Sequence, residues 1–329
     1  MKTMFTRREL LAAGAASIAL PGLPALAQQG GYPDHPVRLI VPFPIGGGTD
    51  ISARSIGTQL QVELGQSLVI DNRPGASGTI GTLAAMRMPP DGYNLLFTTS
   101  TNQVIAPLLL DKPPYDGARD FTPITLLISY VGVLLISASL PVSNFKEFVA
   151  YAKERPGKLN YGSSGIGSTN HLLGEMLNNR TGMQLVHVPY KGSAQAVQGL
   201  AAGEVQLFFD TVPDAQIWLK QGKVKVIATS SEKRSSLMPD VPTLVELGVF
   251  DGSTDYWMGL VAPPGTPAAI VERVHAAAAK AMASPEMRQF STTMGGVPSI
   301  NTPAEFGRML VAEQTRWGEV IQRNHIRAE

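Results

Sequence analysis

Short apolar runs alternate with amphipathic segments along the first third of the chain. Residues 37–41 form an apolar run of strand length, and residues 50–64 follow with Ile56 and Leu60 at helical spacing. Gly65 then ends the helix, because glycine readily adopts the left-handed conformation of helix ends. The same alternation predicts strands at 68–70 and 94–99 and a helix at 79–88. Strands separated by helices indicate βαβ units with a parallel sheet.

The alternation continues in the rest of the chain. Residues 124–136 are too rich in β-formers for a helix, and we expect strands there that lead into a second domain. A strand at 256–262 enters the turn Pro263–Pro267 and is expected to return the chain to the first domain. Between these points the pattern predicts helices at 144–155, 169–180 and 193–203 and strands at 159–161, 186–190, 205–209 and 224–229, with a last helix at 268–282.

These elements predict an α/β fold of two lobes. Each lobe is expected to hold a mainly parallel sheet flanked by helices, with a ligand cleft where strand ends of the two lobes face each other. Lobe 1 is predicted to be discontinuous, from residues 28–128 and 252–329, and lobe 2 to comprise residues 129–251.

The first residues have the composition of an export signal. Lys2, Arg7 and Arg8 precede a mostly apolar run at 10–27 that ends in a small-x-small pattern. We therefore expect residues 1–27 to be a signal peptide of the Sec or twin-arginine type and the mature protein to be periplasmic. A retained membrane helix is the alternative, but prolines interrupt the apolar run.

Composition excludes several classes of function. The 329 residues are 44% hydrophobic and 16% charged, which is ample for a buried core and for two domains. The formal net charge is +1, and removing residues 1–27 leaves −1, so no nucleic-acid partner is expected. The chain has no cysteine, which excludes disulfides, zinc–thiolate sites, iron–sulfur clusters and thiol catalysis.

Three stretches place glycine and small hydroxyl residues between an apolar run and a helical pattern. They are residues 42–50, 72–78 and 161–168. Glycine lets backbone N–H groups turn toward a ligand, and the first N–H groups of the next helix are unpaired and partly positive. A carboxylate can therefore dock there without lysine or arginine. Three such loops in one exported chain predict an anion-binding pocket.

The predicted ligand contacts come from both lobes. They are Phe43, Gly46, Gly47, Gly48, Thr49, Ser100, Thr101 and Asn102 in the first lobe, and Ser163, Ser164, Gly167, Ser168, Thr169, His171, Lys191 and Asp210 in the second. Structural alternatives stay open for three of these features. The first loop could be a plain turn with Asp50 as the helix cap, Phe43 could be a core residue, and Lys191 could be an ordinary solvated lysine. Residues 100–102 have an equally plausible capping role. Segment 72–78 is expected to lie behind the site as a structural turn.

Two further features concern metals and buried charge. His171 and Glu175 lie one helical turn apart, a spacing that can hold a metal but more often makes a side-chain pair. Because two ligands are too few, no metal and no cofactor is predicted. Asp210 follows a strand, where a buried carboxylate needs backbone donors, water or a ligand hydroxyl or amine.

Seven motifs occur in the same order as in one known family. They are Pro42–Asp50, Asn72–Gly78, Asp91–Tyr93, Asp120–Pro123, Tyr161–Glu175, Val188–Gly192 and Pro263–Pro267. Over essentially the whole mature chain the sequence resembles the periplasmic substrate-binding proteins of tripartite tricarboxylate transporters, often called Bug-type receptors. The resemblance implies a type II-like periplasmic binding protein that closes on a small organic carboxylate and delivers it to integral-membrane transporter subunits. It also implies that His171 orients the loop at the cleft, whereas Ile45 departs from the family's frequent proline or alanine.

Two other functions need features that can be checked in the sequence. An exported serine hydrolase needs a Gly-x-Ser-x-Gly elbow, and neither 75–79 nor 162–166 has the final glycine. The spacings of phosphate-binding and dinucleotide-binding loops do not occur either, so no enzyme activity is expected. A sensor that passes its ligand-loaded state to a membrane signalling partner uses the same fold and stays an alternative. We expect a monomer.

Overall fold

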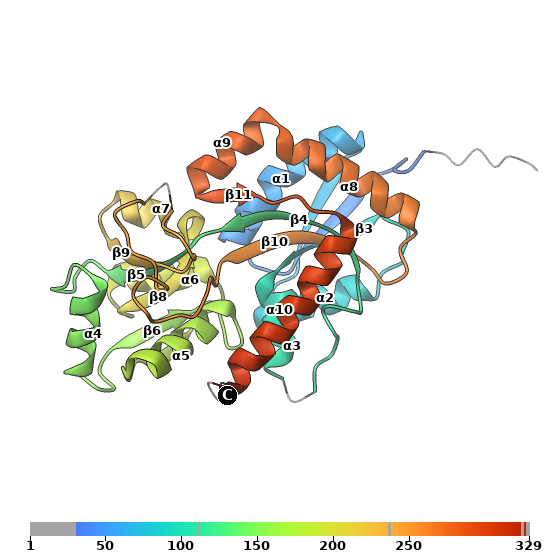
Figure 1. Ribbon diagram of the computed structural model, residues 1–329. Coiled ribbons are helices and arrows are strands. Elements are labelled where there is room, and N and C mark those ends of the chain that lie inside the picture. Colours follow the sequence, from blue (N-terminus) through green and yellow to red (C-terminus); the bar gives the residue numbers. More distant parts are fainter. Residues whose placement is uncertain (1–30, 111, 236–237, 324–325, 327–329) are drawn as a thin grey trace, which may run out of the picture. The chain divides into compact units, whose positions relative to one another are not determined.

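Two β-sheets, each covered by helices, organise the chain from Pro33 onward (Figure 1). The computed structural model describes residues 31–110, 112–235, 238–323 and 326. The signal peptide expected at residues 1–27 lies outside the described residues. We call the first sheet with its helices the first lobe, and the second sheet with its helices the second lobe.

The first sheet brings together strands from both ends of the chain. Its strands are β1 (Val37–Val41), β2 (Leu68–Asn72), β3 (Asn94–Thr99), β4 (Thr122–Tyr130), β10 (Tyr256–Ala262) and β11 (Gly296–Pro298). Their order is β11-β4-β10-β3-β1-β2. β1 is parallel to both of its neighbours, with Val37 opposite Leu68 and Arg38 opposite Asn94. β10 is antiparallel to β3 and to β4, and β11 is antiparallel to β4.

The second sheet is continuous in sequence. Its strands are β5 (Gly132–Ser137), β6 (Asn160–Ser163), β7 (Val186–Pro189), β8 (Leu207–Thr211) and β9 (Val224–Thr229). Their order is β7-β6-β8-β5-β9, with β6 parallel to β7 and β8, and β5 antiparallel to β8 and β9. Asp210, predicted just past a strand, is the penultimate residue of β8.

Both sheets are mixed, which corrects the prediction of mainly parallel sheets. β10 enters the first sheet against β3 and β4, and β5 enters the second against β8 and β9. Each of these two strands is the first strand after the chain passes from one lobe to the other. Parallel pairing needs a crossover connection, usually a helix, and no such crossover precedes these strands, so they pair antiparallel. The first crossing is at Val131 and the second lies between β9 and β10. The lobe limits of the sequence analysis stay a prediction.

The helices agree with the sequence pattern wherever it predicted them. They are α1 (Gly48–Leu64), α2 (Thr79–Met86), α3 (Ala106–Leu108), α4 (Phe145–Lys153), α5 (Thr169–Thr181), α6 (Ser193–Ala202), α7 (Val212–Lys220), α8 (Ala268–Ala283), α9 (Pro285–Met294) and α10 (Pro303–Arg323), with short turns η1 (Ala76–Gly78) and η2 (Thr101–Ile105). Gly65, Gly182 and Gly203 close α1, α5 and α6 in the left-handed conformation, as predicted. The sequence pattern predicted none of α3, α7, α9, α10 and β11.

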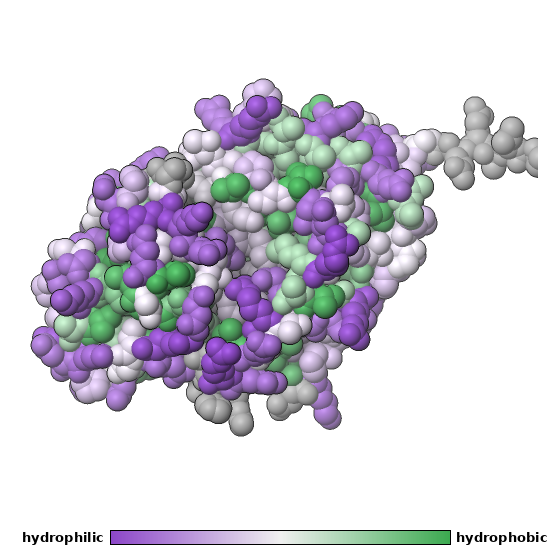
Figure 2. All heavy atoms as spheres, viewed as in Figure 1, coloured by the Kyte–Doolittle hydropathy of each residue, from purple (hydrophilic) through white to green (hydrophobic). Residues whose placement is uncertain are grey.

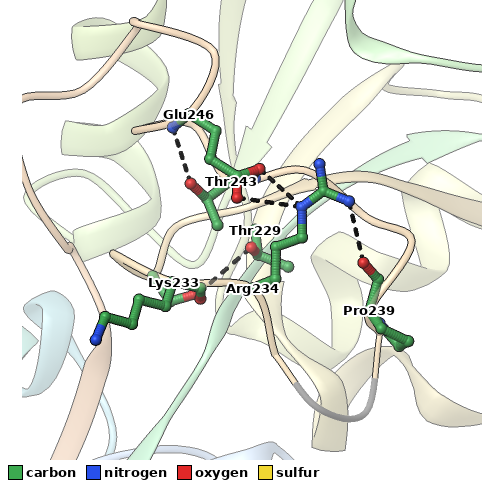
Figure 3. Close-up of polar contacts among 7 residues, drawn as sticks. Thr229, Lys233, Arg234, Pro239, Thr243 and Glu246 are labelled. Carbon is green, nitrogen blue, oxygen red and sulfur yellow. Dashed lines mark hydrogen bonds and ion pairs between the residues drawn. The ribbon is translucent and has the colours of Figure 1, made fainter.

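The polar contacts of Arg234 hold the segment that leads from β9 back to the first lobe (Figure 3). Arg234 Nε donates to both carboxylate oxygens of Glu246, at 3.1 and 2.8 Å, and Nη1 donates to the carbonyl of Pro239. The hydrogen bond from Arg234 holds the pKa of Glu246 below its ordinary value. The N–H of Glu246 also donates to the Thr243 hydroxyl at 2.9 Å, so this segment is tied together before it reaches β10.

The surface is a mixture of hydrophobic and hydrophilic residues. On the face drawn in Figure 2, hydrophobic residues form small groups among hydrophilic ones, and the surface is hollowed between the two lobes. Scattered apolar groups of this kind are ordinary where a protein meets water. Among the described residues, no helix is long and apolar enough to cross a bilayer.

The long helix α10 is held to the first lobe by one buried stripe. Phe306, Leu310, Trp317 and Ile321 are its buried residues, at spacings that place them on one face. The ring of Phe306 is fully buried and meets Trp257 of β10 edge to face, with ring centroids 5.7 Å apart. This contact joins α10 to the strand that completes the first sheet.

Replacing Phe306 with alanine should remove this contact and leave a cavity. We expect the free energy of unfolding to fall by about 3–5 kcal/mol, measured by urea denaturation. The control is Val311→Ala on the same helix, where the side chain is 48% exposed and the change should stay within about 0.5 kcal/mol. Equal losses in the two variants would show that the Phe306 contact does not hold α10.

Candidate functional site

A cleft of about 710 Å³ lies between loops of the two lobes. Its walls come from the β1–α1 and β2–α2 loops of the first lobe and from the β6–α5 and β7–α6 loops of the second. The lining residues are 42–45, 47–49, 74–78, 164–166 and 189–195. Loops at the carboxyl ends of parallel strands are the usual ligand-binding position in α/β sheets.

A smaller cavity of about 50 Å³ adjoins the cleft, and we call it the polar recess. Phe43, Thr49, Ser164 and Ser193 line both spaces, so the recess is continuous with the cleft. The other residues that line the recess are Thr99, Ser100, Thr101, Asn170, Asp210, Thr211, Tyr256 and Trp257.

Four helices begin at the polar recess. Thr49 is the second residue of α1, Asn170 is the second of α5, Ser193 is the first of α6, and Thr211 is the cap position of α7. The first N–H groups of a helix have no carbonyl partner within it and carry a partial positive charge. Helix starts from both lobes therefore make the recess attractive to an anion.

Asp50 fixes the backbone of the β1–α1 loop. Its carboxylate accepts hydrogen bonds from the N–H of Gly46 and from Arg54 Nε, each at 2.9 Å. Asn72 donates both to Asp50 and to the carbonyl of Phe43. Burial acts to raise the pKa of Asp50, but hydrogen bonds from Arg54, Gly46 and Asn72 outweigh it, so this pKa lies below its ordinary value. The cap position of α1 is Gly47, and Asp50 instead holds the turn before it.

The three residues after β3 lie in different places. Asn102 is fully buried, and its amide donates to Thr82 inside the first lobe. The hydroxyl of Thr101 meets that of Thr169 at 2.6 Å, which joins the two lobes. Ser100 lines the polar recess and is 2% exposed, and its hydroxyl has no hydrogen-bond partner among the described residues. A buried hydroxyl of this kind needs a partner, and an oxygen of a ligand in the recess would supply one.

The β2–α2 loop lies on the cleft wall, in contrast to the turn behind the site that its sequence predicts. Ala76 and Ser77 have φ angles of +47° and +52°, which cost non-glycine residues about 1 kcal/mol or more. Ser77 Oγ donates to the carbonyl of Ile166 in the second lobe at 2.5 Å. The strained turn therefore brings this loop to the opposite wall. Glycines at 75 and 78 are its sequence signal, but they fit an ordinary turn equally well.

In the β6–α5 loop, two predicted contacts support the backbone. Ser168 is fully buried and accepts the N–H of His171 at 3.3 Å, which caps α5. Ser163 is also fully buried, and its hydroxyl donates to the carbonyl of Gly165 at 3.1 Å. Ser164, one residue further on, lines both the cleft and the recess.

Three stacked rings lie behind this loop. The ring centroids of Tyr161 and His187 are 5.0 Å apart, and those of His187 and His171 are 4.1 Å apart. The Nδ1 atom of His171 accepts the N–H of Gly167 at 3.3 Å. Burial, and then the neighbouring His171, lowers the pKa of His187 to about 4. The two imidazoles therefore support the loop with at most one positive charge near neutral pH.

Ser163 and His187 are in contact, as a serine hydrolase would require. Their Oγ and Nε2 atoms are 2.6 Å apart. Ser163 is fully buried, however, and its hydroxyl also bonds to Gly165, so a substrate carbonyl has no access to it. This pair gives the hydrolase alternative no support.

Lys191 and Asp210 are the charged residues of the site. Lys191 lines the cleft and Asp210, 2% exposed, lines the recess. Within the described part of the chain, no other charged side chain lines either space. Tyr190 and Gly192 also line the cleft but were not predicted. Their signal is the sequence Lys191-Gly192-Ser193 before a helix, which repeats the pattern of the other loops.

The structure brings about half of the predicted contacts to a cavity wall. Phe43, Gly47, Gly48, Thr49, Ser100, Thr101, Ser164, Lys191 and Asp210 line the cleft or the recess, and Gly46, Asn102, Ser163, Gly167, Ser168, Thr169 and His171 lie outside both walls. Contact with a ligand stays a prediction for all of them. Among the described residues, no three histidine, aspartate or glutamate side chains could share a metal ion. Glu175, one turn from His171, accepts the hydroxyl of Tyr161.

The low pKa of His187 should make stability depend on pH. Between pH 6.5 and about 4 the unfolded chain binds a proton at this residue and the folded protein does not. The free energy of unfolding should therefore fall as the pH falls, by up to about 1.4 kcal/mol per pH unit. Urea denaturation at pH 7, 6 and 5 should show a shallower dependence for His187→Gln than for the wild type.

The matched control is His35→Gln, at a side chain that is 60% exposed and far from the stack in sequence. It should keep the pH dependence of the wild type. An unchanged pH dependence in His187→Gln would mean that the stacked ring does not resist protonation.

Residues 52–326 match the family model described as "Tripartite tricarboxylate transporter family receptor". A Cupriavidus necator protein, called the UPF0065 protein in gbd 5'region, is 38% identical over 289 residues, which cover 87% of this chain and 86% of that protein. Protein BugT of Bordetella pertussis is 33% identical over 314 residues, which cover 95% of this chain and 96% of that protein.

Solved structures agree with this match. One described as a periplasmic transporter is 36% identical, with a TM-score of 0.87 over 91% of this chain and 100% of its own. An R. palustris protein solved with adipate is 35% identical, with a TM-score of 0.86 over 90% and 99%. MatC from Rhodopseudomonas palustris, with bound malate, is 31% identical, with a TM-score of 0.83 over 88% and 100%. This chain belongs to the tripartite tricarboxylate transporter receptors, a family of solute-binding proteins.

Proposed function

We propose that this protein is an exported receptor that captures a small organic carboxylate and delivers it to a tripartite tricarboxylate-type membrane transporter. The observation that carries the proposal is the polar recess, where helices of both lobes begin and where the Ser100 hydroxyl is buried without a partner among the described residues. Related proteins with adipate and malate bound support a carboxylate as the solute.

In this proposal the carboxylate takes donors from both lobes. Thr49 and Ser100 offer hydroxyls from the first lobe, and Ser193 offers one from the second. The starts of α1 and α6 add N–H groups that have no partner inside their helices. Water fills the gaps that these short side chains leave. The predicted contacts outside the walls hold the loops in position.

Capture by closure is supported by how the lobes are joined. The chain crosses between them at Val131 and again between β9 and β10, and a hinge would move at these two connections. Beside the cleft, Thr101 bonds to Thr169 and Ser77 bonds to the carbonyl of Ile166 across the lobes. A ligand that touches both walls gains its full set of contacts only in the closed state. It therefore shifts the population toward closure in proportion to that difference in affinity.

Export and delivery form the second half of the proposal. The matching family model is described as the receptor of a transporter, and residues 1–27 have the composition of a signal peptide. The expected partners are integral-membrane transporter subunits. Vesicles that contain those subunits should take up a radiolabelled carboxylate only when this protein is added. Uptake that is independent of the protein would contradict delivery and leave capture unaffected.

Replacing Ser100 with alanine should weaken carboxylate binding. The hydroxyl donates one hydrogen bond to a charged oxygen in a buried site, so its loss should reduce affinity about tenfold. A thermal-shift screen with malate, adipate, citrate and 3-phenylpropionate would first identify a ligand, since a solute that binds only the folded state raises the melting temperature. Calorimetry with that ligand then compares the variants.

The matched control for this experiment is Ser143→Ala, an exposed serine before α4 in the second lobe. It should bind the ligand as the wild type does. If no carboxylate in the screen raises the melting temperature, the proposed function is wrong. Wild-type affinity in Ser100→Ala would remove Ser100 from the site.

A further inference from the structure

Outside the polar recess, the cleft is lined mainly by apolar and rigid side chains. Its apolar lining includes Phe43, Pro44, Ile45, Pro74, Ile166 and Tyr190. Phe43 and the prolines come from the first lobe, and Ile166 and Tyr190 come from the second. Pockets that hold a small molecule usually combine such walls with a few polar groups that fix its orientation. Here the cleft supplies the apolar walls, and the recess supplies the polar groups.

Two large side chains of this lining are exposed. Ile45 is 72% exposed and Ile166 is 40% exposed, and they lie on the walls of opposite lobes. Leaving an isoleucine side chain in water forfeits the free energy that its burial would give. An apolar body between these walls would cover both side chains at once.

The walls of the cleft are close together at one edge. A methyl group built on Gly192 would lie 3.2 Å from Cγ of Pro44, so the β7–α6 loop touches the β1–α1 loop there. Proline rings are fixed to the backbone, and the aromatic rings of Phe43 and Tyr190 are flat and rigid. Such walls favour a flat, rigid ligand, which loses little conformational freedom when it binds.

The charges on the walls match a single carboxylate. Lys191 is the one cation and Asp210 the one anion that line either space in the described part of the chain. A carboxylate in the recess is served by helix starts and by Ser100. Among the described residues that line the cleft, Lys191 is the one charged partner for a second carboxylate, whereas the isoleucine, proline and aromatic side chains that make up most of the lining would take water from it without supplying a hydrogen bond.

The size of the cleft also exceeds what a short diacid needs. Its volume of about 710 Å³ lies within the range of about 300–1,000 Å³ that drug-sized ligands occupy. A four-carbon diacid would leave most of the apolar wall uncovered. A ring attached to the carboxylate by a short linker would fill that space.

We propose that the solute is a monocarboxylate that carries one aromatic ring. Its carboxylate lies in the polar recess beside Ser100, and its ring lies between Ile45 and Phe43 on one wall and Ile166 and Tyr190 on the other. This inference rests on the proposed function and specifies its ligand. It differs from the adipate and malate complexes of the related proteins, whose ligands are aliphatic diacids.

Calorimetry on the mature protein, purified from the periplasm, tests the class of ligand. The probes are 3-phenylpropionate, hexanoate and adipate: hexanoate lacks the ring, and adipate lacks the ring and carries a second carboxylate. We expect 3-phenylpropionate to bind about tenfold more tightly than either of the others, because only its ring covers both walls.

A pair of variants then locates the ring. Ile166→Ala should weaken the binding of 3-phenylpropionate about fivefold and change that of adipate little, because it removes wall area and no polar contact. The control is Ile217→Ala on α7, an isoleucine that is 58% exposed and lies outside the cleft wall. It should leave both affinities unchanged. Both side chains are exposed, so neither substitution should disturb the fold.

The outcomes separate the inference from the proposed function. Adipate or hexanoate binding as tightly as 3-phenylpropionate would overturn the aromatic class and leave the carboxylate receptor intact. Equal effects of Ile166→Ala and Ile217→Ala would also overturn it. Failure of all three probes, together with malate and citrate, would refute the receptor function itself.

Discussion

The N–H groups at the starts of helices from both lobes are the physical constraint on which the site depends. Such groups cannot be paired inside their own helices, and four helices begin at the polar recess, a space of only about 50 Å³. An N–H group that is removed from water without a hydrogen-bond partner costs free energy. An anion in that space reduces this cost because it accepts hydrogen bonds. This arrangement explains how an anion site can exist with Lys191 as the sole cation on the described walls. Affinity then depends on where the backbone is held.

Several residues near the recess fix the backbone of the loops that lead into these helices. Asp50 and Asn72 fix the loop before α1 through hydrogen bonds to Gly46 and Phe43. The histidine stack and the cap of α5 do the same for the opposite loop. Side chains that face the apolar part of the cleft do not fix the loop backbone in this way. They can change without loss of the anion site.

The elements were predictable because burial leaves a periodic trace in the sequence. The spacing of Ile56 and Leu60 predicted α1 to within two residues, and Gly65 marked its end. Strand pairing left no such trace, so the position of β10 between β3 and β4 was not predictable. In the site, composition indicated the loops but not the direction of each hydroxyl. Ser164 and Ser168 look equivalent in sequence, yet capping of α5 turns Ser168 inward. The wall formed by residues 74–78 depends on backbone strain at Ala76 and Ser77, which ordinary turn residues conceal.

The central place of β10 in the first sheet has a consequence for how the protein is made. β3 and β4 are neighbours in sequence but are separated in space by a strand that begins at Tyr256. The edges of β3 and β4 that pair with β10 therefore stay without partners until most of the chain, including the second lobe, has been synthesised. During that interval the half-built sheet exposes apolar strand edges to other chains. Biogenesis of this receptor thus requires that its first half be shielded until the last third arrives.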